Sequence, residues 1–367
     1  MLIDIIAGAR PNFIKIAPII DAIEEQQRKG NNLQYRLVHT GQHYDKKMSG
    51  DFFEQLNIPL PHINLEAGSG SQAEQTGKIM LGYEQLLMKE PCDLCIVVGD
   101  VTSTMACSIV AKKANNIKVA HVEGGIRSGD WSMPEEINRI VTDSITDFFF
   151  TTSEVANNNL RKSGVSEERI FFVGNTMIDT LFKQMPNFRK PEIWNTLKLK
   201  AKEYIIMTLH RPSNVDDKEN LKELINEIVQ ASKGLPLIFP VHPRTAKMLE
   251  IIGINATNLH CIEPLGYLEF NFLVKHAKVV ITDSGGITEE TTVMGIPCMT
   301  LRSSTERPET CTVGTNELIG TNPKNIAPFF EKLMLQQWKT GKIPELWDGK
   351  TAERIVSCIM RLFNLKK

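Results

Sequence analysis

Short apolar runs alternate with amphipathic stretches along this chain. Strands that alternate with helices form βαβ units, whose strands run parallel in one sheet. In the first half, the expected strands are Leu2–Ala7, Tyr35–His39, Leu94–Val98, Lys118–Val122, Phe148–Thr151 and Ile170–Val173. The expected helices there are Ile14–Arg28, Gln72–Lys89, Thr102–Asn115, Pro134–Thr146 and Ser153–Ser163. The pattern predicts a doubly wound α/β domain.

The alternation restarts after a polar stretch, 188–202, which we expect to link two domains. The second set of strands is Tyr204–Thr208, Leu237–Pro240, Leu259–Ile262, Lys278–Thr282 and Cys298–Leu301. Its helices are Lys218–Ser232, Thr245–Ile251, Gly266–Lys275 and Ile287–Met294, and Thr351–Leu365 forms a final amphipathic helix. Two doubly wound domains that face each other would bind a ligand in a cleft at the carboxyl ends of their strands.

Charge and hydropathy exclude several classes of protein. Lys and Arg number 42 against 43 Asp and Glu, so the basic excess typical of nucleic-acid-binding proteins is missing. No run approaches the roughly 20 apolar residues of a membrane helix, and the N-terminus lacks the basic region of a signal peptide. The seven cysteines favour a reducing, cytoplasmic compartment. Cys92 and Cys95 have metal or redox spacing, but with no second pair nearby we expect buried strand cysteines.

A strand end, two glycines and a helix start follow one another in 281–290, where we expect the helix to begin at about Ile287. Free N–H groups at a helix N-terminus, with the Ser284 hydroxyl, form a cradle for a diphosphate. Glu290 either binds ribose hydroxyls or merely favours the helix dipole. We favour nucleotide binding over a plain capped turn.

Two cations follow other expected strand ends. Arg10 follows the first strand in Gly8-Ala-Arg-Pro11, which lacks the GxGxxG pattern of dinucleotide sites. Arg307 lies in the loop after the last expected strand, where its guanidinium suits paired phosphate oxygens. Taken alone, a structural turn explains the Arg10 motif equally well, and a surface loop with solvated charges explains the Arg307 segment better than phosphate binding does.

Carboxylates and a histidine stand at the ends of four further elements. Asp100 and Glu123 follow strands, Glu135 opens a helix, and His210 follows the first strand of the second half. Carboxylates grouped in a partly dry cleft raise one another's pKa, which suits one as acid and another as base. Capping or helix-dipole roles explain each residue singly, and their convergence on one cleft favours catalysis. Because the histidines show no HxH or HExxH spacing, no metal site is expected.

Seven motifs stand together in the order found in one family: 8–11, 99–104, 121–128, 133–139, 209–211, 283–290 and 305–309. Together they resemble the non-hydrolysing UDP-N-acetylglucosamine 2-epimerases of bacteria and archaea, from about residue 3 to about residue 320. The resemblance implies a GT-B fold, with Rossmann-like domains 1–185 and 186–349 and a cleft between them. The last helix, 350–367, would cross back to the first domain.

The resemblance also implies a reaction. A base removes the proton at C2 of the sugar while UDP leaves C1, which gives a 2-acetamidoglucal intermediate. After reprotonation on the other face, UDP adds back. A UDP-sugar is then the substrate, no redox cofactor is needed, the product serves surface polysaccharide synthesis, and a homodimer is expected.

The family's functional positions carry over one by one. Its catalytic residues match Asp100, Glu123, Glu135 and His210, and which carboxylate performs which proton transfer stays open. Its positions for the substrate and UDP match Arg10, Lys15, His242, Ser284, Gly285, Gly286, Glu290 and Arg307.

Departures from the family pattern bear on the substrate and on regulation. The segments 41–45, 127–132 and 297–301 look more like the branch acting on 2,3-diacetamido uronic acids, whose C6 carboxylate would need a further cation from Arg127, Arg211 or Arg302. The functions of a GT-B glycosyltransferase and of a non-catalytic UDP-sugar sensor also stay open. Asp45 and Glu74 stand where members activated by a second UDP-sugar carry Gln and Arg, so we expect such activation to be absent or different.

Overall fold

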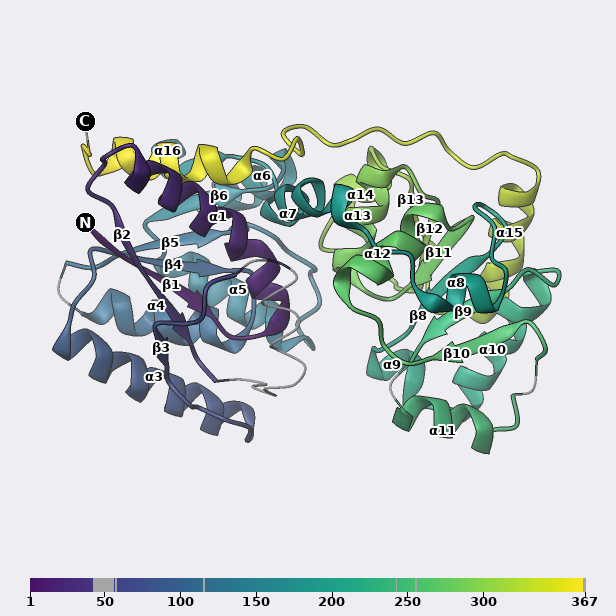
Figure 1. Cartoon of the computed structure of the whole chain (residues 1–367). Helices are drawn as coiled ribbons and strands as arrows, with labels where there is room; N and C mark the ends of the chain where they lie inside the picture. The colour runs from purple at the N-terminus through teal and green to yellow at the C-terminus, as the bar shows by residue number, and fades with distance from the viewer. Residues whose placement is uncertain (42–55, 57, 115, 242, 255, 366–367) are drawn as a thin grey trace. The chain divides into compact units, whose positions relative to one another are not determined.

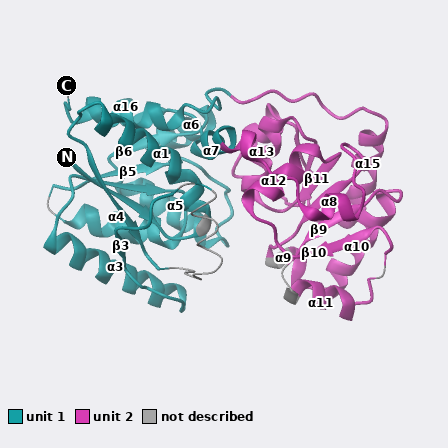
Figure 2. Cartoon of the chain, viewed as in Figure 1, with its two compact units in different colours: residues 1–183, 345–367 teal, residues 184–344 magenta. Residues whose placement is uncertain are grey.

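The computed structural model describes residues 1–41, 56, 58–114, 116–241, 243–254 and 256–365 (Figure 1). For five of these residues the description is limited to the backbone: Arg10, Pro212, Ser213, Pro243 and Arg244. The chain divides into two compact units (Figure 2). Unit 1 contains residues 1–183 and 345–367, and unit 2 contains residues 184–344.

Unit 1 is built on a seven-stranded parallel sheet with the order β3-β2-β1-β4-β5-β6-β7. Its strands are β1 (Leu2–Ala7), β2 (Gln34–His39), β3 (Ile63–Asn64), β4 (Leu94–Val98), β5 (Lys118–Val122), β6 (Phe148–Thr151) and β7 (Ile170–Phe172). Its helices are α1 (Arg10–Arg28), α3 (Gln72–Lys89), α4 (Thr102–Lys113), α5 (Pro134–Ile145), α6 (Glu154–Lys162), α7 (Thr176–Gln184), the 3-10 turn Glu167–Arg169 and α16 (Thr351–Leu362).

Helices cover both faces of this sheet. In Figure 1, α1 and α16 lie on one side and α3 and α4 on the other. Every residue of β4 is buried, which fits a central strand that packs helices on both faces. The strand order reverses between β1 and β4, so the carboxyl ends of these two strands flank the switch point where α/β sheets bind ligands. The doubly wound α/β architecture expected from the sequence is confirmed.

The C-terminal segment returns to unit 1, as predicted. The Trp347 side chain is fully buried, and its indole N–H donates to the Thr152 carbonyl at 3.0 Å. At the start of α16, the Asp179 carboxylate accepts the backbone N–H groups of Thr351 at 3.1 Å and Ala352 at 2.7 Å. These contacts fasten the last helix against α7 and α1.

Unit 2 is built on a six-stranded parallel sheet with the order β10-β9-β8-β11-β12-β13. Its strands are β8 (Ile205–Thr208), β9 (Leu237–Pro240), β10 (Leu259–Ile262), β11 (Val279–Thr282), β12 (Cys298–Thr300) and β13 (Asn316–Leu318). Its helices are α8 (Glu192–Thr196), α9 (Pro212–Val215), α10 (Lys218–Ala231), α11 (Pro243–Ile251), α12 (Tyr267–His276), α13 (Gly285–Met294), α14 (Pro308–Thr312) and α15 (Ile326–Met334), with 3-10 turns at Met185–Asn187 and Pro323–Asn325. Here the switch point lies between β8 and β11.

The structure differs from the expected elements at several places. Helix α13 begins at Gly285 and not at about Ile287, because both glycines adopt helical backbone behind an extended Ser284. The stretch 188–202 contains α8, and the Trp194 ring packs against that of Phe272 with centroids 5.3 Å apart, so this stretch belongs to the core of unit 2.

Two further expectations concern cysteines and membranes. Cys95 lies in β4 and Cys92 just before it, and both are buried, as expected for strand cysteines. Within the described residues, no helix combines the length and the apolar character needed to span a membrane.

Candidate active site

The carboxyl ends of β1 and β4 are tied together by one side chain. Asn12 accepts the N–H groups of Gly8 at 3.1 Å and Ala9 at 3.0 Å, and donates to the Val98 carbonyl at 3.0 Å. The turn after β1 is thereby fixed beside the end of β4. Arg10 is the first residue of α1, and its expected contact with UDP stays a prediction because its side chain is outside the description.

Glu123 follows β5 in a left-handed backbone conformation with φ of 72°. A residue other than glycine rarely adopts this conformation, and such backbone strain is concentrated at functional sites. The Lys15 ammonium lies 2.7 Å from Glu123 Oε2, and both side chains are largely buried. The cation expected to bind UDP therefore orients a carboxylate expected to be catalytic.

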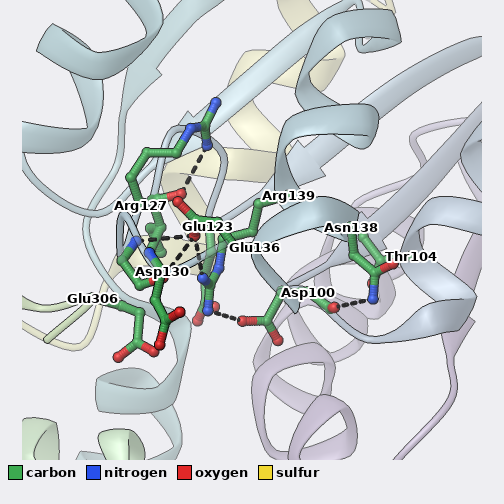
Figure 3. A network of polar contacts seen from close by, with 12 residues as sticks. Asp100, Thr104, Glu123, Arg127, Asp130, Glu136, Asn138, Arg139 and Glu306 are labelled. Carbon is green, nitrogen blue, oxygen red and sulfur yellow. Dashed lines mark hydrogen bonds and ion pairs between the residues drawn. The ribbon is translucent and has the colours of Figure 1, made fainter. Parts of the chain in front are cut away.

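Asp100 follows β4 and is held from α5 (Figure 3). Arg139 Nη2 donates to Asp100 Oδ2 at 2.5 Å, and Asn138 Nδ2 donates to the Asp100 backbone carbonyl at 2.8 Å. The Asp100 side chain is 32 % exposed, so it stays accessible to a ligand. Glu135 lies one turn earlier on α5 and is half-buried, with no side-chain hydrogen bond among the described residues.

Glu136 anchors the loop that precedes α5. It accepts hydrogen bonds from the backbone N–H groups of Ser128 at 2.9 Å and Gly129 at 3.0 Å. It also accepts one from Arg139 Nη1 at 2.6 Å (Figure 3). Burial acts to raise the pKa of Glu136, but these hydrogen bonds outweigh it and lower the pKa below its usual value. Arg139 thus joins an ionised Glu136 to Asp100 and sets the position of the Asp100 carboxylate.

A buried pair, His121 and Asp143, supports the same strand ends. His121 Nδ1 lies 2.7 Å from Asp143 Oδ1, and His121 Nε2 lies 2.8 Å from the Gly99 carbonyl. Asp143 also accepts the Gly125 N–H at 3.0 Å and Arg127 Nη1 at 2.6 Å. Burial acts to raise the pKa of Asp143, but the contacts with His121 and Arg127 outweigh it, and the pKa lies below its usual value. The pair therefore holds the backbone at Gly99, just before Asp100, and at Gly125, just after Glu123.

In unit 2, two residues, Asp283 and Ser284, connect β11 to α13. The Ser284 N–H donates to Thr282 Oγ1 at 2.9 Å, while the Ser284 side chain makes no capping hydrogen bond. Ser284, Gly285 and Gly286 are all half-buried. The first N–H groups of a helix have no partner within the helix, so this turn can receive an anion.

Glu290, further along α13, and Arg307, which contacts the neighbouring Glu289, are both buried. Glu290 Oε1 accepts the Tyr267 hydroxyl at 2.7 Å and the Asn271 amide at 3.4 Å. Burial raises the pKa of Glu290 to about 7, despite the opposing effect of these hydrogen bonds. Arg307 Nε donates to Glu289 Oε1 at 2.8 Å, so a carboxylate fixes the guanidinium that the sequence assigns to the diphosphate.

His210 follows β8, and its side chain is 61 % exposed. His210 Nδ1 lies 2.7 Å from Asp283 Oδ1, at the end of the neighbouring strand β11. His242, which the sequence places in the second domain, lies outside the described residues. Among the residues that the structure describes, no group of three His, Cys, Asp or Glu side chains could hold a metal ion.

Sequence reasoning missed four residues whose side chains support these strand ends: Arg139, His121, Asp143 and Asp283. Arg139 lies four residues after Glu135, so both stand on one face of α5, and this spacing could have indicated it. No local signal marks Asp143, which reaches its partners only through the packing of α5 on β5.

The contacts of the residues expected to govern activation by a second UDP-sugar do not show whether that activation occurs. The Glu74 carboxylate accepts the Ser71 N–H at 2.8 Å in a capping box at the start of α3. Asp45 lies outside the described residues. The expected absence of that activation stays a prediction.

Comparison with known proteins covers nearly the whole chain. The sequence model of one family, UDP-N-acetylglucosamine 2-epimerase, matches residues 25–360. The UDP-N-acetylglucosamine 2-epimerase of Methanocaldococcus jannaschii is 42% identical over 97% of this chain and 98% of its own. The UDP-2,3-diacetamido-2,3-dideoxy-D-glucuronate 2-epimerase of Pseudomonas aeruginosa is 38% identical over 86% of this chain and 87% of its own.

Solved structures agree with the sequence comparison. The crystal structure of the M. jannaschii enzyme in complex with UDP-GlcNAc and UDP aligns with a TM-score of 0.87 at 41% identity, covering 98% of this chain and 100% of that one. The fold expected from the sequence, two Rossmann-like units of GT-B type, is thereby confirmed.

Proposed function

Because the chain belongs to the UDP-N-acetylglucosamine 2-epimerase family, we propose that it inverts C2 of UDP-N-acetylglucosamine, giving UDP-N-acetylmannosamine. The observation that carries this proposal is the set of carboxylates at neighbouring strand ends of unit 1. Asp100 and Glu123 follow the adjacent strands β4 and β5, and Glu135 stands on the helix that holds Asp100. A 2-epimerase needs more than one proton-transfer group, because the proton leaves one face of C2 and returns to the other.

Removal of the C2 proton accompanies departure of UDP from C1, and a 2-acetamidoglucal is the intermediate. Glu123, Asp100 and Glu135 are the candidates for the two proton transfers. The ion pair with Lys15 supports a fixed, ionised role for Glu123. Asp100 and Glu135 are the more accessible carboxylates.

Unit 2 supplies the groups that suit UDP. Negative charge grows on the diphosphate as the C1–O bond breaks, and a helix N-terminus with a fixed guanidinium stabilises such charge. The first turn of α13, with Ser284, Gly285 and Gly286, has this character, and Arg307 lies in the same unit, fixed by Glu289 on α13. Glu290 suits the ribose hydroxyls, because both of its described contacts fall on Oε1.

Among the family's substrates, the described cations favour a sugar without a C6 carboxylate. Arg302 donates two hydrogen bonds of 2.7 Å to Glu306, and both side chains are nearly buried. Arg127 pairs with Asp143 at 2.6 Å, and Arg211 contacts Glu306 at 3.6 Å. Each of the three arginines that the sequence offers for a uronate thus already faces a carboxylate. The 2,3-diacetamido uronate remains the alternative substrate, since the P. aeruginosa relative that is named for it is 38% identical.

One experiment tests both the reaction and the substrate. The protein is incubated in D2O with UDP-N-acetylglucosamine, and separately with the diacetamido uronate, without an acceptor. We expect deuterium at C2 and the manno epimer with the first compound. Exchange with the uronate alone would assign the chain to the other branch, and transfer that requires an added acceptor would identify a glycosyltransferase.

We further propose that the protein works in the cytoplasm as a homodimer and serves surface polysaccharide synthesis. The described cysteines are all free, which supports a reducing compartment. Light scattering of the purified chain at several concentrations tests the dimer, and a monomer at all of them would refute it.

A further inference from the structure

We propose that Asp283 is a positioning residue that fixes the tautomer and direction of the His210 imidazole, so that His210 gives a proton through Nε2 to the diphosphate oxygen that leaves C1 and takes it back when UDP adds again. This inference rests on the proposed function, because it assigns the histidine a proton-transfer role in that reaction. Nothing in the sequence pattern joins the two residues, which lie 73 positions apart.

Sheet register brings the two residues together. β8 and β11 are parallel neighbours in which Thr208 is paired with Thr282. Asp283 is the first residue after β11, and His210 follows β8 by two residues. The topology therefore places a histidine and a carboxylate side by side at the switch point of unit 2, where α/β sheets carry their ligand-binding groups.

The Asp283 carboxylate is fully buried and is held by four donors. It accepts the backbone N–H of His210 at 3.1 Å, that of Arg211 at 2.9 Å, and Asn214 Nδ2 at 3.0 Å. The fourth contact is the one to His210 Nδ1, at 2.7 Å. Burial acts to raise the pKa of Asp283, but the hydrogen bonds from His210, Asn214 and Arg211 outweigh it and lower the pKa. Asp283 is thus an ionised acceptor with no freedom to turn away.

An ionised carboxylate can only accept, so Nδ1 must carry a proton. The described contacts of the ring are all made at this nitrogen, and most of the side chain is exposed. When the imidazolium gives up its other proton, that proton leaves Nε2 and the Nδ1 proton stays beside Asp283. Asp283 itself takes up no proton, as in other carboxylate–histidine pairs.

The charged groups around the pair belong to the same strand ends. Arg211 Nε donates to the Asp283 backbone carbonyl at 3.2 Å, and its Nη2 lies 3.6 Å from Glu306. Glu306 is in turn bound by Arg302. Asp283 also directly precedes Ser284, the cap of α13. The carboxylate that orients the histidine therefore belongs to the same turn as the proposed diphosphate cradle, and this fixes the imidazole relative to that cradle.

The test compares Asp283→Asn with Asn214→Ala, which removes a hydrogen bond from the same carboxylate but leaves the contact to Nδ1. Asparagine keeps the shape and can leave the ring in the wrong tautomer, so we expect kcat for UDP-N-acetylglucosamine to fall by roughly 10²- to 10⁴-fold with little change in KM. Asn214→Ala should lose far less of kcat. In addition, 15N NMR of histidine-labelled protein, with His210→Gln for assignment, reports which ring nitrogen of neutral His210 is protonated.

We expect Nδ1 to be protonated in the wild-type protein and Nε2 in Asp283→Asn. A folded Asp283→Asn protein with wild-type kcat would overturn the proposal, and so would wild-type His210 protonated at Nε2. The second measurement needs no variant of Asp283, so it decides even if that variant fails to fold. Failure of the proposed function gives a different result from failure of this proposal. In that case the wild-type protein exchanges no deuterium at C2, while the tautomer of its His210 still shows whether Asp283 orients the ring.

Discussion

At the scale of single residues, the Glu290 carboxyl is sensitive to pH in the neutral range. Burial raises its pKa to about 7, so the group is mostly protonated below that pH and mostly ionised above it. If ribose hydroxyls donate to the carboxylate, binding requires the ionised form. We therefore predict that the affinity for UDP falls as the pH drops below about 7.

Calorimetric titration of UDP between pH 6 and pH 8 (roughly one unit either side of that pKa) checks this prediction. A terminal phosphate also titrates with a pKa of about 6, so the wild-type protein is compared with Glu290→Gln, which shares that background. The variant should bind more weakly and lose the part of the pH dependence due to the carboxyl. Identical pH profiles for the two proteins would contradict the role of Glu290.

Lys15 offers a second test at this scale, since its described contact is the ion pair with Glu123. Replacing Lys15 by Met leaves Glu123 as a buried carboxylate without its cation, which disturbs its position and its charge. We expect Lys15→Met to lower kcat by roughly 10²-fold or more, the range typical of a disabled acid or base, and to change UDP affinity little. Steady-state kinetics and UDP titration separate the two effects. Loss of UDP affinity with unchanged kcat would instead support the UDP-binding role that the family resemblance implies for Lys15.

At the scale of elements, the last helix depends on one carboxylate of another helix. Asp179 on α7 accepts two N–H groups at the start of α16, both in buried surroundings. Because unpaired buried donors are costly, Asp179→Ala should lower the free energy of unfolding by about 1–3 kcal/mol. Urea unfolding measures this loss, and hydrogen exchange should rise in residues 345–365. The matched control is Glu353→Ala, which replaces an exposed side chain in the first turn of α16, the turn that Asp179 contacts. Equal stability of the two variants would contradict the anchoring role.

Some helices and strands could be predicted from the sequence, and others could not. The central strands and the long helices follow from apolar periodicity, and strand-end residues such as Asp100 and Glu123 follow from the βα alternation itself. Helix α13 starts two residues before the expected position. The sequence-based prediction places its start too late because glycine has a low helix propensity, which argues against Gly285 and Gly286 as its first residues. The pairings of Lys15 with Glu123 and of His210 with Asp283 depend on which strands are neighbours, which the order of residues along the chain does not reveal.

At the scale of the whole molecule, the proposal divides the work between two units, and one pair of variants tests that division. Gly285→Ala adds a methyl group whose nearest neighbour, Arg302 Nη1, is 4.0 Å away, so the fold should accept it. Alanine within a helix is even favoured over glycine by about 0.5–1 kcal/mol. The same methyl group stands where a diphosphate would approach the backbone. We therefore predict weak UDP binding without loss of stability.

Asp100→Asn should do the reverse in unit 1. It keeps the size of the side chain held by Arg139 but removes a carboxylate proposed for proton transfer. We expect deuterium exchange at C2 to fall by roughly 10²- to 10⁴-fold while UDP binds as in the wild-type protein. The two variants are expected to lose different properties. UDP affinity and deuterium exchange at C2, both measured on each variant, therefore distinguish separate roles of the two units from a general loss of structure. If Asp100→Asn also loses UDP, or Gly285→Ala binds it normally, the assignment of UDP to unit 2 and of the proton transfers at C2 to unit 1 is wrong.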